Sequence, residues 1–216
     1  LRLIENTVNL GQTGALQVGL EACRAPFIAR LDADDLCEPD RFSAQLDAFT
    51  RFPNTVLVGG QALFIDASDQ VIGRSSLPTN STHIAAIMTV TNPFIHSAVM
   101  FDRAAALRVG GYDNEFLIAQ DYALWSALLR AGGSMMNLSQ PVCRLRLHAA
   151  QVTGSGLRTR EAPEALRITA LNQGWIMGES TMPDDNARAI QALWQGPSGP
   201  TDPSSSVARL LAAPRL

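Results

Sequence analysis

"FIARLDADDLCEPDR", residues 27–41, places four aspartates within nine residues, directly after a short apolar run. The apolar run is typical of a buried strand, and Asp32, Asp34, Asp35 and Asp40 follow it. In open parallel sheets, ligands bind beyond the carboxyl ends of the strands. We therefore expect a functional site where this strand ends.

The spacing of Asp32 and Asp34 favours a divalent cation. Two neighbouring carboxylates repel each other unless a cation lies between or beside them. Mg²⁺ and Mn²⁺ take one or two protein carboxylates and fill the remaining positions with water and substrate phosphates. An EF-hand calcium loop is excluded, since Leu36 and Cys37 stand where that loop needs an acidic residue and a glycine. A solvated turn before the next helix remains the alternative.

Composition limits the classes of partner. The 216 residues and 46% hydrophobic content fit one large domain, or one domain with a tail. A net charge of −3 predicts no broad basic surface for nucleic acid. All 17 basic residues are arginines, which excludes mechanisms that need a lysine. The uncharged residues 75–101 contain Pro, Asn and His, which argues against a transmembrane helix.

Alternating strand and helix patterns predict an α/β fold with a mostly parallel sheet. Strands are expected at residues 1–5, 27–31, 55–60, 94–101, 135–138 and 142–147, and the main helices at 13–24, 39–52 and 120–131. In the helix at 39–52, Phe42, Leu46 and Phe49 are expected on the buried face. Residues 152–216 predict a helical and Pro/Ser-rich tail, partly disordered, after a domain at 1–151.

Five stretches occur in an order that resembles the family 2 glycosyltransferases with the GT-A fold. They begin with the segment that holds "ARLDADD" and continue with "LVGG", "NPFIHSAVMFDR", "VGGYDNEFLIAQDYALWSALLRAG" and "CRLRLH". The resemblance covers residues 1–151 and implies a three-layer α/β/α architecture. Family members begin with further strands that make the first nucleotide contacts, so we expect this chain to lack its N-terminal nucleotide-binding strands.

The resemblance also implies the residues of a donor site. Asp34 and Asp32 would bind the metal, with Asp32 also near the ribose of the nucleotide. Asn9 and Gly11, in "VNLGQ", would belong to the nucleotide-binding loop. Arg30 would assist from the strand, or simply form an ion pair with a neighbouring aspartate.

Three further residues match positions on the acceptor side and at the end of the domain. Asp121 would be the catalytic base, since a carboxylate at a helix N-terminus is stabilised as an anion; simple capping of that helix is the alternative. His148 would be a late metal ligand or phosphate contact. His96 is either a wall of the acceptor site or a structural histidine. Gln120 stands where many members have Glu, so any contact that needs a second charge is lost.

The function implied by the resemblance is Mg²⁺- or Mn²⁺-dependent transfer of a sugar from a nucleoside diphosphate sugar to a hydroxyl acceptor, with inversion. The acceptor would be a saccharide, a lipid-linked glycan or a protein in bacterial polysaccharide or glycoconjugate synthesis. The expected location is the cytoplasm, with peripheral association at the inner face of the membrane. Another metal-dependent nucleotide-sugar enzyme and a non-catalytic truncated remnant remain alternatives.

Overall fold

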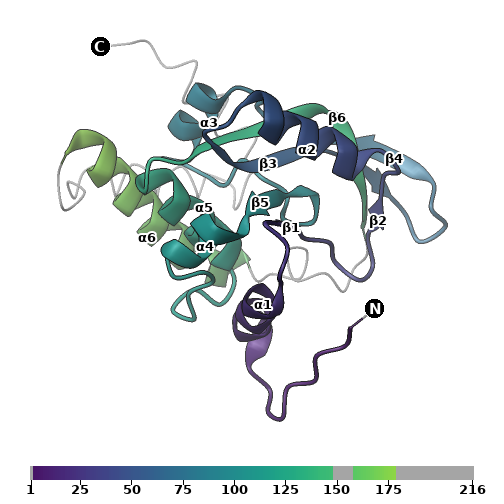
Figure 1. Cartoon of the computed structure of the whole chain (residues 1–216), viewed down its shortest axis with the longest axis horizontal. Coiled ribbons are helices and arrows are strands. Elements are labelled where there is room, and N and C mark those ends of the chain that lie inside the picture. Colours follow the sequence, from purple (N-terminus) through teal and green to yellow (C-terminus); the bar gives the residue numbers. More distant parts are fainter. Residues whose placement is uncertain (1, 148–157, 179–216) are drawn as a thin grey trace.

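The computed structural model describes residues 2–147 and 158–178, which form a six-stranded sheet flanked by helices (Figure 1). The strands are β1 (Phe27–Ala29), β2 (Leu36–Cys37), β3 (Thr55–Ile65), β4 (Val71–Arg74), β5 (Met100–Asp102) and β6 (Ser134–Arg146). The helices are α1 (Gly11–Ala22), α2 (Arg41–Arg51), α3 (Ser81–Ile87), α4 (Arg103–Arg108), α5 (Gln120–Arg130) and α6 (Arg158–Met177), with a 3₁₀ turn η1 (His96–Ala98).

The sheet has the order β1-β5-β3-β6-β2, and β4 pairs with β3 outside this path. The longest pairing, β3 with β6, is parallel, whereas the other pairings are antiparallel. β1, β3 and β6 therefore run in one direction, as an α/β fold predicts. The sheet was expected to be mostly parallel, but it is mixed, because β5 lies between β1 and β3 and is antiparallel to both.

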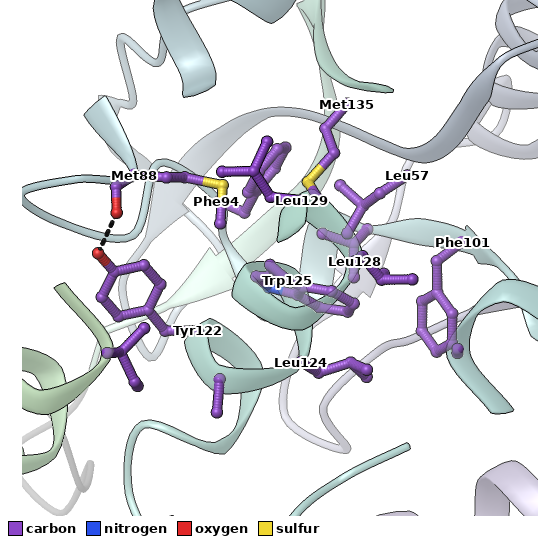
Figure 2. Close-up of a cluster of buried hydrophobic side chains, with 14 of the residues drawn as sticks. Leu57, Met88, Phe94, Phe101, Tyr122, Leu124, Trp125, Leu128, Leu129 and Met135 are labelled. Atoms are coloured by element: carbon purple, nitrogen blue, oxygen red, sulfur yellow. Dashed lines mark hydrogen bonds between the residues drawn. The ribbon is translucent and has the colours of Figure 1, made fainter. Parts of the chain in front are cut away.

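Helices cover both faces of the sheet, which makes the predicted three layers. Side chains alternate between the two faces of a strand. Leu57 of β3 packs on one face with Trp125 and Leu128 of α5, in the core shown in Figure 2. The next residue, Val58, packs on the opposite face with Phe49 of α2.

Four predicted strands differ from the structure. Residues 2–5 are exposed and belong to no strand, because no strand of the described residues pairs with them. The run at 94–101 forms η1 before the short β5. The two strands expected at 135–147 are one bent strand, whose pairing with β3 shifts register around Gln61.

The buried face of α2 also differs from the prediction. Phe42 is 52% exposed and Leu46 42% exposed. The residues turned inward are Arg41, Gln45, Ala48 and Phe49. The buried face is therefore shifted by about one residue toward the N-terminus of the helix. The reason is that backbone carbonyl groups beneath the helix accept hydrogen bonds from the side chains of Arg41 and Gln45.

The C-terminal helix α6 packs against α5. Ala165, Ile168, Thr169 and Asn172 of this helix are buried. The helix thus shares the core of the domain, whereas a domain boundary after residue 151 stays a prediction. Among the helices that the structure describes, none combines the length and hydropathy that a membrane span requires.

Candidate functional site

The turn after β1 gathers three carboxylates. One oxygen atom each from Asp32, Asp34 and Asp35 lies within 4.8 Å of the others. Asp35 is buried, and its Oδ1 accepts a hydrogen bond from the backbone N–H of Arg146 at 2.9 Å. Its Oδ2 is also buried and has no hydrogen-bond partner among the described residues. Asp35 was not predicted as a ligand, although it adjoins the predicted pair in the sequence.

This donor set fits a hard divalent cation. Burial raises the pKa of the Asp35 carboxyl, and the neighbouring charges of Asp34 and Asp32 act in the same direction. Mg²⁺ and Mn²⁺ prefer such oxygen ligands. A cation here would give the unpartnered oxygen of Asp35 a partner and would relieve the repulsion among the three carboxylates.

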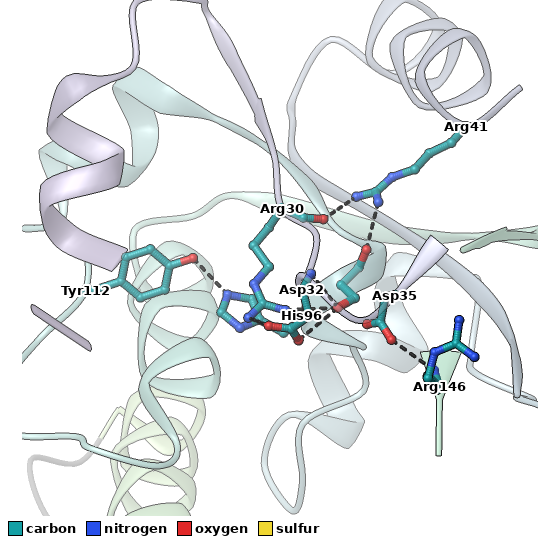
Figure 3. Close-up of polar contacts among 8 residues, drawn as sticks. Arg30, Asp32, Asp35, Arg41, His96, Tyr112 and Arg146 are labelled. Atoms are coloured by element: carbon teal, nitrogen blue, oxygen red, sulfur yellow. Dashed lines mark hydrogen bonds and ion pairs between the residues drawn. The ribbon is translucent and has the colours of Figure 1, made fainter. Parts of the chain in front are cut away.

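Arg30 and Ser97 hold Asp32 in place (Figure 3). The guanidinium group of Arg30 forms an ion pair with both carboxylate oxygens of Asp32, and it donates a hydrogen bond to Ser97 Oγ at 2.9 Å. Ser97 Oγ donates to Asp32 Oδ2 at 3.0 Å and accepts from the backbone N–H of Asp32 at 3.2 Å. The structure therefore shows the ion pair between Arg30 and a neighbouring aspartate that was one of the two interpretations of Arg30.

The backbone under this turn is fixed by Arg41, a buried cation that the sequence analysis did not single out. Arg41 is 1% exposed, and burial lowers its pKa. Its guanidinium group donates to the carbonyl oxygens of Arg30 (2.8 Å), Ser97 (2.7 Å) and Val99 (2.8 Å). Gln45, one turn along α2, donates to the carbonyl oxygens of Val58 and Ala98, both at 2.8 Å. One face of α2 thus ties together the chain around β1, β3 and β5.

Asp121 lies in the first turn of α5 and is half-buried. Its Oδ1 accepts from the backbone N–H of Tyr122 at 2.7 Å, and its Oδ2 accepts from Asn92 Nδ2 at 2.9 Å. The N-cap of α5 is Ala119, so Asp121 is not the capping residue that the alternative interpretation required. Burial raises its pKa, which makes its anion a stronger base.

His96 lies beside Arg30, and Tyr112 contacts the ring of His96 (Figure 3). His96 Nε2 and the Tyr112 hydroxyl are 2.9 Å apart. Burial lowers the pKa of His96 well below its ordinary value, and the charge of Arg30 acts in the same direction, so the ring is neutral at pH 7. The charge of Arg30 acts to lower the pKa of Asp121, against the larger effect of burial, so Asp121 lies within electrostatic reach of the guanidinium group that pairs with Asp32.

Among the described residues, Asn9 and Gly11 are bonded to each other and not to the acidic turn. Asn9 Oδ1 accepts from the backbone N–H of Gly11 at 2.9 Å, and Gly11 has a φ of 69°, which favours glycine at the start of α1. Their role in nucleotide binding stays a prediction. His148 lies outside the described residues.

A sequence model of the family described as "Glycosyl transferase family 2" matches residues 1–110, just over half of the chain. The chain belongs to glycosyltransferase family 2. Asp32 and Asp34 occupy the Asp-x-Asp positions of this family 2 glycosyltransferase. The fold and family expected from the sequence are therefore confirmed.

Two curated relatives cover the same part of the chain. The amylovoran biosynthesis glycosyltransferase AmsE of Erwinia amylovora is 34% identical over 139 residues, which is 64% of this chain and 51% of that protein. The UDP-Gal:alpha-D-GlcNAc-diphosphoundecaprenol beta-1,3-galactosyltransferase of Escherichia coli is 32% identical over 140 residues, with 64% and 50% covered. The chain spans about half the length of the curated relatives it matches.

A solved structure shares the fold of this family 2 glycosyltransferase. The mannosyltransferase PcManGT from Pyrobaculum calidifontis, solved in complex with GDP-Man and Mn²⁺, aligns with a TM-score of 0.54. The alignment covers 100% of this chain and 59% of that chain, at 16% identity. At this identity the similarity shows the GT-A fold alone.

Proposed function

We propose that this chain carries the metal-binding and catalytic part of a glycosyltransferase that moves a sugar from a nucleoside diphosphate sugar to a hydroxyl group of a bacterial glycan. The observation that carries the proposal is the cluster of Asp32, Asp34 and Asp35 with a buried, unpartnered carboxylate oxygen. Family membership restricts the reactions that such a cluster serves to glycosyl transfer.

Asp32, Asp34 and Asp35 would hold a Mg²⁺ or Mn²⁺ ion. When bound, this cation would neutralise the negative charge that grows on the nucleoside diphosphate as it leaves. The similar fold of a mannosyltransferase whose structure contains GDP-Man and Mn²⁺ supports a divalent cation and a nucleotide-sugar donor. Arg30 and Ser97 keep Asp32 in one orientation for this contact.

Asp121 is proposed as the general base. Its raised pKa improves its ability to accept a proton from the acceptor hydroxyl, and it acts only when ionised, above that pKa. Asn92 and the backbone N–H of Tyr122 orient the two carboxylate oxygens. The deprotonated hydroxyl would attack the anomeric carbon from the side opposite the diphosphate, which inverts the configuration.

A lipid-linked glycan at the inner face of the membrane is proposed as the acceptor. The support is that one relative is named for amylovoran biosynthesis and another for transfer to a diphosphoundecaprenol-linked sugar.

Thermal melting with Mn²⁺ and UDP, GDP or dTDP tests the donor site, each alone and in combination. A nucleotide at about 100 times its Kd adds about 2.7 kcal/mol, which raises Tm by about 5 to 10 °C in a chain of this size. We expect a metal-dependent shift with one nucleotide, lost in Asp34→Asn. Asp40→Asn, an exposed change a few residues away, is the matched control and should keep the shift. A folded wild-type chain without any shift would contradict the proposal.

A further inference from the structure

Helix α6 touches the surroundings of Asp121 from two sides. It begins beyond residues 1–110, where the family match ends. One contact reaches the loop that leads into α5, and the other reaches the segment that leads to Asn92. Both segments are neighbours of Asp121, in sequence or through a hydrogen bond.

The first contact is made by the carboxylate of Glu164. Its Oε1 accepts a hydrogen bond from the backbone N–H of Leu117 at 3.1 Å. Its Oε2 accepts from the backbone N–H groups of Ile118 at 3.0 Å and Ala119 at 2.8 Å. Hydrogen bonds to an ionised carboxylate are about twice as strong as neutral ones, so three of them fix this loop firmly.

Glu164 accepts the backbone N–H of the N-cap residue of α5 from another helix. Ala119, the N-cap residue, has no side chain that accepts a hydrogen bond. A helix N-terminus leaves backbone N–H groups without intrahelical partners and favours nearby negative charge. Glu164 gives the N–H of Ala119, two residues before Asp121, an acceptor and places a negative charge near this end of α5. The N–H of Tyr122 is bonded by Asp121 itself.

The second contact fixes the segment that carries the partner of Asp121. Asn172 Nδ2 donates to the carbonyl oxygen of Met88 at 2.7 Å, and Gln173 Nε2 donates to that of Thr89 at 2.9 Å. Asn92 follows three residues later and donates to Asp121 Oδ2. Asn172 is fully buried, so its bond to Met88 is not exchanged with solvent.

We propose that Glu164 is a positioning residue for the general base, and that α6 belongs to the catalytic unit of the enzyme. Glu164 acts by fixing the first turn of α5, and therefore the direction of the Asp121 carboxylate. The inference rests on the proposed function, because it assumes that Asp121 accepts a proton from the acceptor.

The test compares Glu164→Gln with Arg167→Gln in the full chain. Arg167 lies on the same helix and touches the same loop, through Glu115 at 2.7 Å and over the ring of Phe116, but its side chain is 59% exposed. Nucleotide release is measured with Mn²⁺ and with UDP-galactose, GDP-mannose or dTDP-glucose, chosen by the nucleotide that shifts the melting temperature. Hydrogen exchange of residues 115–123 is measured without ligand.

In Glu164→Gln we expect kcat to fall on the order of tenfold or more, because small displacements of a catalytic group are costly. The KM for the donor and the melting shift with Mn²⁺ and nucleotide should not change, and the amides of 117–119 should exchange faster. Arg167→Gln should match the wild type in all four measurements.

The inference would be overturned by a Glu164→Gln variant with wild-type kcat, or by one with unchanged exchange in this loop. Loss of activity through a higher donor KM alone would also contradict it. If the wild-type chain itself shows no metal-dependent melting shift, the proposed function fails; the exchange measurement still decides whether Glu164 holds the loop.

Discussion

Arg41 Nη1 donates a hydrogen bond of 2.7 Å to the carbonyl oxygen of Ser97, 56 positions further along the chain. The same guanidinium group reaches the carbonyl oxygen of Arg30, so one buried side chain connects the two segments that hold Asp32. Arg30 and Ser97 both contact Asp32 directly. The geometry of the acidic turn therefore depends on Arg41, which acts on Asp32 through the backbone of Arg30 and Ser97.

Replacement of Arg41 is expected to destabilise the fold. Arg41→Met removes the Arg41 donor from the carbonyl oxygens of Arg30 and Ser97 and from Gln45 Oε1, which costs about 3 kcal/mol or more in the free energy of unfolding. The carbonyl oxygen of Val99 keeps its bond from the backbone N–H of Arg30. Arg51→Met, an exposed change in the last turn of the same helix, should cost less than about 1 kcal/mol. Urea unfolding of both variants checks the difference, and equal losses would contradict the role given to Arg41.

Ser97→Ala is expected to weaken the donor site more than the fold. The change removes the hydroxyl that bonds both Arg30 and Asp32. A hydrogen bond to a charged group contributes about 1.5 kcal/mol or more, so the Kd for nucleotide in the presence of Mn²⁺ should rise about tenfold. Ser43→Ala removes an exposed hydroxyl in α2 and serves as the control. Calorimetric titration measures both, and an unchanged Kd in Ser97→Ala would refute this link.

Asp121→Asn should separate chemistry from binding. A general base contributes about 10²- to 10⁴-fold to the rate, so kcat should fall by that factor while the melting shift with Mn²⁺ and nucleotide remains. Asp113→Asn, an exposed change in the turn before α5, should retain activity. Steady-state nucleotide release checks the prediction, and a variant that keeps wild-type kcat would exclude Asp121 as the base.

The raised pKa of Asp121 also predicts a dependence of stability on pH. The folded state holds the proton of Asp121 above the ordinary value of 3.8, so it binds more protons than the unfolded state in that range. The free energy of unfolding contributed by this group therefore falls as the pH rises from 3.8 through the folded pKa. The free energy of unfolding of the wild type minus that of Asp121→Asn should fall as the pH of the urea titration rises above about 4. A difference that rises with pH would show the opposite shift.

Two glycines should respond in opposite ways to alanine. In β3, a Cβ at Gly59 would lie 2.1 Å from Asn137 Oδ1 and 2.9 Å from Phe94 Cδ1, so Gly59→Ala should cost about 1 to 3 kcal/mol of stability. Gly19, inside α1, has open space around it, and Gly19→Ala should add about 0.5 to 1 kcal/mol. Thermal unfolding compares the two variants; a tolerated Gly59→Ala would mean that the Asn137 side chain moves aside.

The sequence predicts those features that depend on neighbours along the chain. The apolar run before Asp32 and the helical period around Asp121 are local patterns, and both elements lie where they were expected. The acidic motif likewise requires only adjacent residues, and its three carboxylates do converge.

Features that depend on distant partners could not be predicted. The face of α2 was assigned by hydrophobicity, but carbonyl groups next to β1 and β5 accept hydrogen bonds from Arg41, which is therefore buried, and Phe42 is exposed. The insertion of β5 between β1 and β3 is set by pairing across more than 40 residues on either side, which no local period records. Glu164 was assigned to a tail, and its role depends on amides in a loop 45 to 47 positions earlier.

The insertion of β5 has a consequence for the order in which the molecule forms. In the pairing of β1 with β5, Phe27 lies opposite Asp102. Asp35 accepts its hydrogen bond from the backbone N–H of Arg146, 111 positions away. Contacts of such sequence separation form late, because closure of long loops costs entropy. During synthesis, a nascent chain that extends only to about residue 100 contains every aspartate of the motif but lacks Arg146, the partner of Asp35. The acidic turn is completed only when β6 emerges, so the proposed metal site would stay unfinished in the nascent chain until that strand has been made.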